Sequence, residues 1–183
     1  QACAIAAEAY ARIHNRIALV CVTTGPGGTN AITGVAGGWL DSIPMLIISG
    51  QVRYDWTARS SGVDIRSMGD QEFDICKSVS CMTKYCEMVT DPMRIRYCLE
   101  KAVYLAYSGR PGPSWLDIPL DVQGAYLESD ELIGFDSKAY EAGGDGWMQS
   151  STHKLDEDIA GQGEKRQKLP PKISEELALK IIE

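Results

Sequence analysis

A glycine-rich turn is the part of the sequence whose residue types could contribute most directly to chemistry. Residues 23–30 read TTGPGGTN and follow the apolar run IALVCV at 17–22. Glycines let backbone approach a ligand closely, and N–H groups at the start of a following helix would face that ligand. The turn is not a dinucleotide fingerprint, because Asn30 occupies the third glycine position, and no Lys-Ser or Lys-Thr of a Walker loop follows. On spacing alone, a ligand site and a tight strand-to-helix connection without a ligand are equally consistent with it.

Short apolar runs and helical segments alternate along residues 2–119, and these elements would position the turn. Residues 2–14 carry apolar side chains at helical spacing, and Asn15 suits the left-handed cap that ends a helix. Another helix is expected from its cap Asp91 to Ser108. Buried strands are expected at 17–22, 45–49 and 115–119, with a short strand within 79–88 and a loop over 51–70.

This alternation predicts an α/β fold, a doubly wound parallel sheet with helices on both faces. In such sheets, ligands bind outside the carboxyl ends of the strands. The rule directs attention to the residues that follow Val22, Ser49 and Ile118. The glycine-rich turn comes directly after the first of these strands.

Composition and charge narrow the class of function. The 183 residues are enough for one domain with a hydrophobic core, and the net charge of −7 argues against nucleic acid or an anionic membrane surface as the main partner. No apolar run approaches the ~20 residues that span a bilayer, and no signal peptide is visible. Six cysteines occur without zinc-site spacing and are expected to be reduced thiols in a cytoplasmic protein.

The character of the sequence changes near residue 124. Residues 1–123 are expected to form one domain that lacks its N-terminal part, because the chain starts with Gln1 inside a helical pattern. A targeting segment lost with that part stays open. Residues 124–171 are polar and glycine-rich, which predicts a linker that is partly disordered. Residues 172–183 show an amphipathic pattern that is typical of the first helix of a following domain.

Four segments, taken in order, resemble one protein family. They are EAYAR at 8–12, IALVCVTTGPGGTNAITGVAGGWLDSIPMLIISGQV at 17–52, GDQEFDI at 69–75 and SGRPGPSWLDIPLDVQ at 108–123. Together they resemble the N-terminal, pyrimidine-binding domain of thiamine-diphosphate-dependent enzymes, most closely the large catalytic subunit of acetolactate synthase and its relatives. The resemblance extends from Gln1 to about Gln123 and is carried by motifs that are not of low complexity.

The resemblance implies a role for the glycine-rich turn and for two glutamines. In the family, the turn lines the aminopyrimidine of thiamine diphosphate, and the glutamine of GDQE lies at the active-site edge near cofactor and substrate. The alternatives are a helix cap for Asn30, an exposed loop amide for Gln71 and a simple strand exit for Gln51. The cofactor-binding residues implied in this way are Gly25, Pro26, Gly27, Asn30, Gln51 and Gln71.

The resemblance also implies the chemistry. In the family, a glutamate hydrogen-bonds N1′ of the pyrimidine, so that the 4′-imine can take the proton from thiazolium C2 and the ylid can attack a 2-keto acid such as pyruvate. That glutamate immediately precedes the residue aligned with Gln1, so no catalytic residue is expected here and the fragment alone should be inactive. Glu8, two helical turns further on, is expected to be a surface or structural residue.

Partners and metal follow from the family as well. The resemblance implies Mg²⁺ on the diphosphate half of the cofactor, bound by a C-terminal domain, and an obligate homodimer or tetramer. Asp41–Pro44 and the small residues at 34–38 match a family segment near the subunit interface, although close packing within the chain would explain them equally well.

One stretch departs from the family. Between GQV and QE the family has a shorter segment that begins with proline, whereas this chain has residues 53–70, beginning with Arg53. In the family this region faces the substrate channel and a bound FAD, so the departure leaves acetolactate formation and FAD binding open. The alternatives are a thiamine-diphosphate enzyme of the same fold that acts in sugar or polysaccharide metabolism, and a non-catalytic binding subunit.

Overall fold

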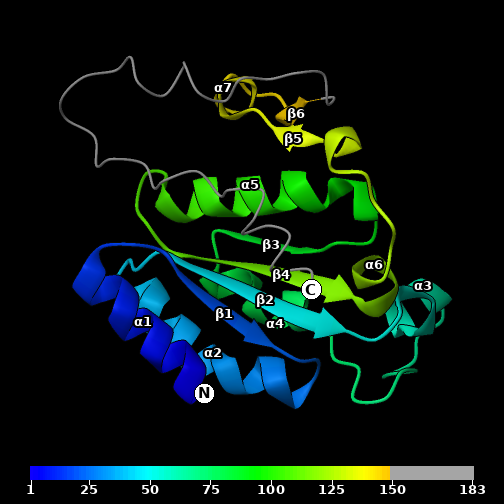
Figure 1. Ribbon diagram of the computed structural model, residues 1–183. Helices are drawn as coiled ribbons and strands as arrows, with labels where there is room; N and C mark the ends of the chain where they lie inside the picture. The colour runs from blue at the N-terminus through cyan, green and yellow to red at the C-terminus, as the bar shows by residue number, and fades with distance from the viewer. Residues whose placement is uncertain (149–183) are drawn as a thin grey trace.

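A computed structural model of the chain describes residues 1–148, built around one parallel sheet (Figure 1). The four strands lie in the order β1-β2-β4-β3, and every neighbouring pair is parallel. This confirms the predicted doubly wound α/β fold, including the short strand expected within 79–88. The strands are β1 (Ala18–Val22), β2 (Met45–Gln51), β3 (Tyr85–Met88) and β4 (Pro113–Pro119).

Helices cover both faces of this sheet. The helices α1 (Ala2–His14), α2 (Pro26–Leu40) and α4 (Ile75–Val79) lie on one face, and α5 (Ile95–Tyr107) lies on the other (Figure 1). Side chains of β2 and β4 alternate between two buried cores, because successive Cβ atoms point to opposite faces. In β2, Ile47 joins the core beneath α1 and α2, whereas Leu46 and Ile48 join the core beneath α5. The strand expected at 17–22 was predicted to be buried, but β1 lies at the edge of the sheet and exposes Leu19 and Cys21 on one face.

The predicted helix ends are largely those of the structure. Asn15 follows α1 in the left-handed conformation, with a φ of 50°, as the cap prediction required. The segment that begins at Asp91 opens with the short 3-10 helix η3 (Pro92–Arg94), where the Asp91 carboxylate accepts a hydrogen bond from the Met93 N–H at 3.0 Å. The helix α5 follows it directly.

The small residues of α2 let it pack closely inside the chain. A Cβ added to Gly34 would lie 2.6 Å from the backbone of Ala4 in α1, and one added to Gly38 would lie 2.5 Å from the Met45 sulfur. A Cβ at Gly37 would meet nothing within 4 Å. Gly34 and Gly38 are therefore explained by packing within the chain, whereas Gly37 lies on an open side of the helix.

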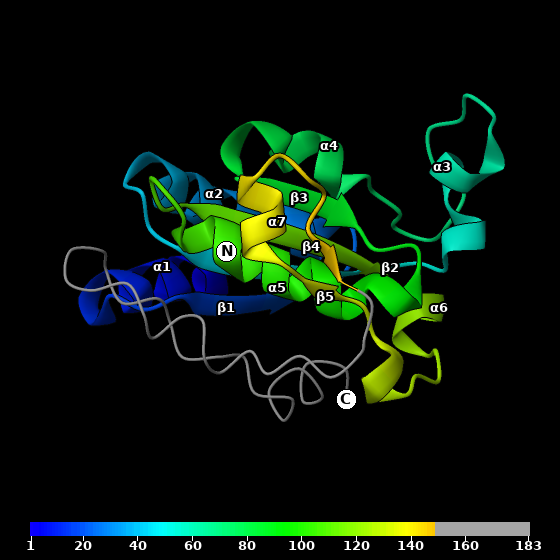
Figure 2. The same ribbon diagram turned by 90° about the horizontal axis from the view of Figure 1, so that it is seen from above.

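Residues 53–73 form an arm that extends beyond the sheet (Figure 2). The arm contains the 3-10 helix η1 (Tyr54–Trp56) and the single-turn helix α3 (Ala58–Ser61), where the sequence predicted a loop. The carboxylate of Glu72 fastens it, accepting hydrogen bonds from the N–H groups of Ala58 and Met68, both at 2.7 Å, and of Gly69 at 3.1 Å. The region that departs from the family thus has an ordered conformation of its own.

Residues 125–148 contain regular structure where the sequence predicted the beginning of a linker. The short antiparallel pair of β5 (Gly134–Phe135) and β6 (Trp147–Met148) and the helix α7 (Ser137–Glu141) lie over α5 (Figure 1). Phe135 is buried and contacts the rings of Tyr97 and Tyr104. Two-residue strands are too short for a readable period, which is why the pattern did not reveal them.

The other short elements are η2 (Ser80–Met82), α6 (Leu120–Gln123) and η4 (Ser129–Glu131). Within residues 1–148, no helix is long and apolar enough to cross a membrane. The rest of the predicted linker, to residue 171, and the predicted start of a following domain at 172–183 lie outside the described residues, so these domain boundaries stay predictions.

Candidate functional site

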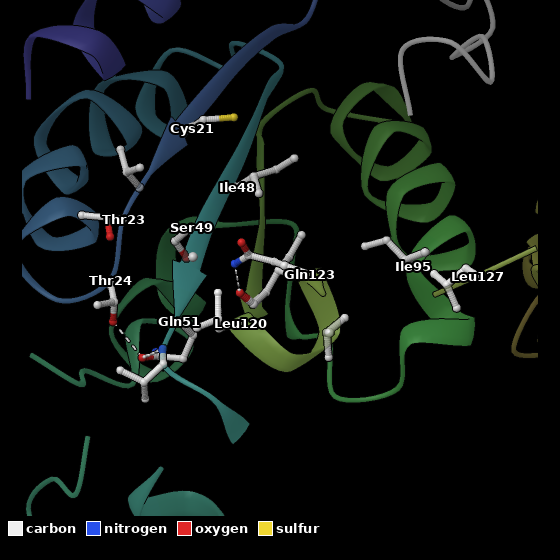
Figure 3. A pocket seen from close by; sticks show the side chains of 15 residues that line it. Cys21, Thr23, Thr24, Ile48, Ser49, Gln51, Ile95, Leu120, Gln123 and Leu127 are labelled. Atoms are coloured by element: carbon white, nitrogen blue, oxygen red, sulfur yellow. Dashed lines mark hydrogen bonds between the residues drawn. The ribbon is translucent and has the colours of Figure 1, made fainter. Parts of the chain in front are cut away.

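A cavity of about 590 Å³ opens at the carboxyl ends of β1, β2 and β4 (Figure 3). This is the place that the rule for parallel sheets predicts, and the volume lies in the range of small-molecule sites. Its walls are mainly apolar, and a few polar side chains reach it from the strand ends. The apolar residues are Cys21, Val22, Ile48, Val52, Ile95, Ile118, Leu120, Val122 and Leu127, the polar ones are Thr23, Thr24, Ser49, Gln51 and Gln123, and Gly50 completes the lining.

The glycine-rich turn is mostly the first part of a helix. The helix α2 starts at Pro26, so Gly27 to Asn30 belong to its first turns, and the capping position is Gly25 rather than Asn30. Gly25 has a φ of 54°, which favours glycine, and a Cβ there would lie only 2.3 Å from the Gln71 carbonyl oxygen. The turn and the loop around Gln71 therefore meet backbone to backbone at Gly25.

The six residues implied by the family separate into an exposed and a buried group. Pro26, Asn30 and Gln71 are exposed, Gly27 is half-buried, and Gly25 and Gln51 are buried. Within residues 1–148, the side chains of Asn30 and Gln71 have no hydrogen-bond partner, so their amides are available to a ligand. Of the six, Gln51 is the one that lines the cavity.

Gln51 is held by four hydrogen bonds. Its Oε1 accepts from Thr24 Oγ1 at 2.7 Å and from the Val52 N–H at 3.0 Å. Its Nε2 donates to the Phe73 carbonyl at 2.9 Å and to Asp117 Oδ2 at 3.0 Å. The amide is thus fully paired and 5% exposed, and it joins the glycine-rich turn to the loop that carries Gln71.

Behind Gln51 lies a buried acid that the sequence reading did not single out. Asp117 is 0% exposed, and its Oδ1 accepts a hydrogen bond from Ser49 Oγ at 2.6 Å. Ser49 Oγ in turn accepts from Trp115 Nε1 at 2.8 Å. The signal in the sequence was Asp117 itself, a charged residue inside the otherwise apolar strand WLDIP.

The electrostatics of this acid are set by opposing effects. Burial raises the pKa of the Asp117 carboxyl to about 6, and the hydrogen bonds from Ser49 and Gln51 act in the opposite direction. Asp74 raises this pKa further and Arg59 lowers it, and these two side chains form an ion pair at 3.3 Å. At neutral pH the carboxylate is therefore mainly ionised.

Glu8, which was expected to be a surface or structural residue, lies in α1 with its side chain 15% exposed, and its role stays a prediction. Its carboxylate forms an ion pair with Arg12 one turn along α1, and Arg12 also contacts Asp41 at 2.5 Å, at the end of α2. Within residues 1–148, no group of His, Cys, Asp and Glu side chains is arranged to hold a metal ion. The expectation that Mg²⁺ binds another domain stays a prediction.

With this geometry in place, a family model gives the decisive match. Residues 1–78 match the family described as "Thiamine pyrophosphate enzyme, N-terminal TPP binding domain". Residues 1–78 belong to this family. The matched part of this thiamine pyrophosphate domain contains the glycine-rich turn, Gln51 and Gln71. The four-stranded parallel sheet with helices on both faces is consistent with that assignment.

Curated relatives of the chain agree. It is 42% identical over 123 residues to the acetolactate synthase large subunit of Corynebacterium glutamicum, a match that covers 67% of this chain and 18% of the relative. It is 38% identical over 126 residues to the acetolactate synthase large subunit of Lactococcus lactis, covering 69% of this chain and 20% of the relative. For acetolactate synthase 2, chloroplastic, of Zea mays, the identity is 41% over 120 residues, with 66% and 18% covered. The chain spans about a fifth of the length of these relatives.

Proposed function

We propose that this chain is the pyrimidine-binding part of a thiamine-diphosphate-dependent enzyme that decarboxylates a 2-keto acid such as pyruvate. Decarboxylation alone would make the enzyme a lyase. Transfer of the remaining fragment to an acceptor would make it a carboligase of the acetolactate synthase type. The observation that supports this most is the contact of Gly25 with the Gln71 carbonyl, since it brings together two loops implied by the family. They meet beside the carboxyl ends of the strands, where parallel sheets bind ligands.

The residues present suit an aminopyrimidine. Such a ring has apolar faces and an edge of hydrogen-bond donors and acceptors. Pro26 offers an apolar ring surface, and Asn30 and Gln71 offer exposed amides that each carry a donor and an acceptor. In this proposal these three side chains bind and orient the pyrimidine, whereas Gln51 fixes the two loops from behind.

The bound cofactor would supply an electron sink for decarboxylation. The contribution of this chain is to hold the pyrimidine in one orientation and to keep water from it. The proposal further includes Mg²⁺ and the diphosphate group on another domain, and a homodimer or homotetramer as the active form. Residues 53–70 of the arm differ from the family region that faces FAD, so FAD is not part of the proposal. A flavin absorbance spectrum of the purified protein tests that choice.

The experiment measures thiamine-diphosphate-dependent CO₂ release and acetolactate formation by the complete gene product with Mg²⁺ and pyruvate. We expect both products. CO₂ without acetolactate would retain the thiamine mechanism and indicate another acceptor, as in the alternative of sugar or polysaccharide metabolism. No turnover, together with no cofactor binding by calorimetry, would overturn the enzyme proposal in favour of a binding subunit.

A matched pair of variants tests the ligand contact itself. Asn30→Ala should raise the thiamine diphosphate concentration needed for half-maximal activity about tenfold, because one hydrogen bond to the cofactor is lost. Thr33→Ala removes another exposed side chain one turn further along α2 and should leave that concentration unchanged. Equal behaviour of the two variants would remove Asn30 from the site.

A further inference from the structure

We propose that Asp117 is a positioning residue for the candidate cofactor site. Its carboxylate, together with the Val52 N–H and the Phe73 carbonyl, fixes the orientation of the Gln51 amide. The oriented amide holds the glycine-rich turn against the loop that carries Gln71. The role in cofactor binding rests on the proposed function, whereas the role in holding the two loops rests on the hydrogen-bond geometry alone.

An amide side chain can be placed in two orientations that differ by exchange of its oxygen and nitrogen. The neighbours of Gln51 require one of them, because the Val52 N–H needs an acceptor and the Phe73 carbonyl needs a donor. The ionised Asp117 carboxylate has acceptors only and therefore selects the same orientation. Thr24 can donate or accept through its hydroxyl, so it does not decide between them.

The oriented amide lies directly behind the contact between the two loops. Thr24, which donates to Gln51, precedes Gly25 in the chain, and Phe73, which accepts from Gln51, follows Gln71 by two residues. A change in the Gln51 amide would therefore weaken hydrogen bonds to both segments that form the Gly25–Gln71 contact.

The Asp117 carboxylate is itself held by hydrogen bonds from Ser49 and Gln51. Ser49 stands opposite it in the register of β2 and β4 and donates to it, while the Trp115 indole fixes the Ser49 hydroxyl. The charged groups that act on it are Asp74 at the start of α4 and Arg59 in α3, which form an ion pair with each other. Since Asp117 is fully buried, loss of its acceptor would leave an unpaired polar hydrogen away from water, which proteins avoid.

The test compares amide hydrogen exchange, followed by NMR on the full 183-residue chain, in Asp117→Asn and in a matched control. The control is Ser114→Ala, since Ser114 is equally buried in β4 and its hydroxyl has no hydrogen-bond partner within the described residues. In Asp117→Asn we expect exchange to accelerate at least tenfold at three N–H groups that mark the loops. These are Val52, Gly27, which donates to the Thr24 carbonyl, and Ile75, which donates to the Phe73 carbonyl.

A charge-swapped double variant separates positioning from mere packing. In Asp117→Asn with Gln51→Glu, the new Asn amide can donate to the new carboxylate, which can still accept from Thr24 and Val52. Protection should return at Val52 and Gly27 but not at Ile75, because the Phe73 carbonyl that Ile75 donates to has lost its hydrogen bond from Gln51 and is no longer held in place. Exchange in Asp117→Asn equal to that in Ser114→Ala, or a double variant no better than the single one, would overturn the proposal.

The affinity of the complete protein for thiamine diphosphate tests whether Asp117 acts on cofactor binding. Asp117→Asn should weaken thiamine diphosphate binding by at least tenfold, the double variant should recover part of that loss, and Ser114→Ala should bind like wild type. Loosened loops with unchanged affinity would overturn the assignment of Asp117 to the cofactor site. A wild-type protein that binds no thiamine diphosphate would overturn the proposed function instead, and the exchange data would still decide whether Asp117 holds the two loops.

Discussion

Buried polar side chains determine the geometry of the candidate site at the residue scale. Burying a carboxylate is unfavourable unless hydrogen bonds occupy its oxygens, and Asp117 receives two, from Ser49 and Gln51. The raised pKa shows that these bonds do not fully offset the loss of water. The fold therefore keeps a destabilising charge at neutral pH, and this charge supports the same Gln51 orientation that Val52 and Phe73 require.

This raised pKa predicts how stability depends on pH. A carboxyl group whose pKa is about 6 in the folded state and about 3.8 when unfolded binds its proton more tightly in the folded state. The contribution of this proton to the free energy of unfolding is complete below the unfolded pKa and is lost as the pH rises through 6. Between pH 4.5 and 7, Asp117 should thus reduce the free energy of unfolding by about 2 kcal/mol.

Urea unfolding of wild type and Asp117→Asn at pH 4.5, 5.5, 6.5 and 7.5 measures this contribution. Other groups titrate equally in both proteins, so the difference between the two curves isolates the group. The free energy of unfolding of Asp117→Asn relative to that of wild type should increase as the pH rises and become constant above pH 7. A difference that is the same at every pH would show that Asp117 does not titrate in this range.

At the scale of elements, close packing of α2 against α1 presents the glycine-rich turn at the end of the sheet. Gly34 permits this approach, because its hydrogen faces the backbone of Ala4, whereas Gly37 faces open space on the same helix. The two glycines therefore have opposite energetic roles. One is required by packing, and the other only weakens the helix relative to alanine.

Substitution of these two glycines by alanine should shift stability in opposite directions. Gly34→Ala should destabilise the chain by about 1–2 kcal/mol, since its methyl group would overlap Ala4 and must force the helices apart. Gly37→Ala should stabilise it by about 0.5–1 kcal/mol through helix propensity. Urea midpoints with unchanged m-values measure both, and destabilisation by Gly37→Ala would mean that its open side is covered in solution.

The same elements show which parts of the structure the sequence could predict. The strands β2 and β4 were predictable because strands covered on both faces are largely apolar. The strand β1 is apolar as well, but the sequence could not show that one of its faces, with Leu19 and Cys21, is exposed. The start of α2 at Pro26 was not, since Gly27 and Gly28 have poor helix propensity and packing against the sheet decides their conformation. The network of Gln51 and Asp117 joins residues 66 positions apart, and only the strand register brings them together. The contact of Gly25 with Gln71 was equally hidden, although both residues were named through the family.

At the scale of the whole molecule, helices and strands continue past residue 123, so the end of the cooperative unit is open to test. The predicted domain ended at residue 123, yet the segment to residue 148 packs on α5 through Phe135 and through polar contacts. Glu100 accepts a hydrogen bond from the Phe135 N–H at 2.7 Å, and the Tyr97 hydroxyl donates to the Asp145 carbonyl at 2.6 Å. The apolar side of α5 that faces away from the sheet is thereby covered, so this segment is expected to unfold together with the sheet.

A single substitution tests whether residues 125–148 belong to the cooperative unit. Phe135→Ala should lower the free energy of unfolding by about 3–5 kcal/mol, since it removes a buried ring that contacts Tyr97, Tyr104 and Tyr140. Tyr126→Ala alters an aromatic residue of the same segment that is 88% exposed, and its effect should stay within about 0.5 kcal/mol. If the segment is instead a loosely attached linker, both variants will unfold like wild type, because a ring that is not held against α5 contributes nothing to the stability of the sheet. A large loss confined to Phe135→Ala, with one unfolding transition, would place the end of the cooperative domain beyond residue 135.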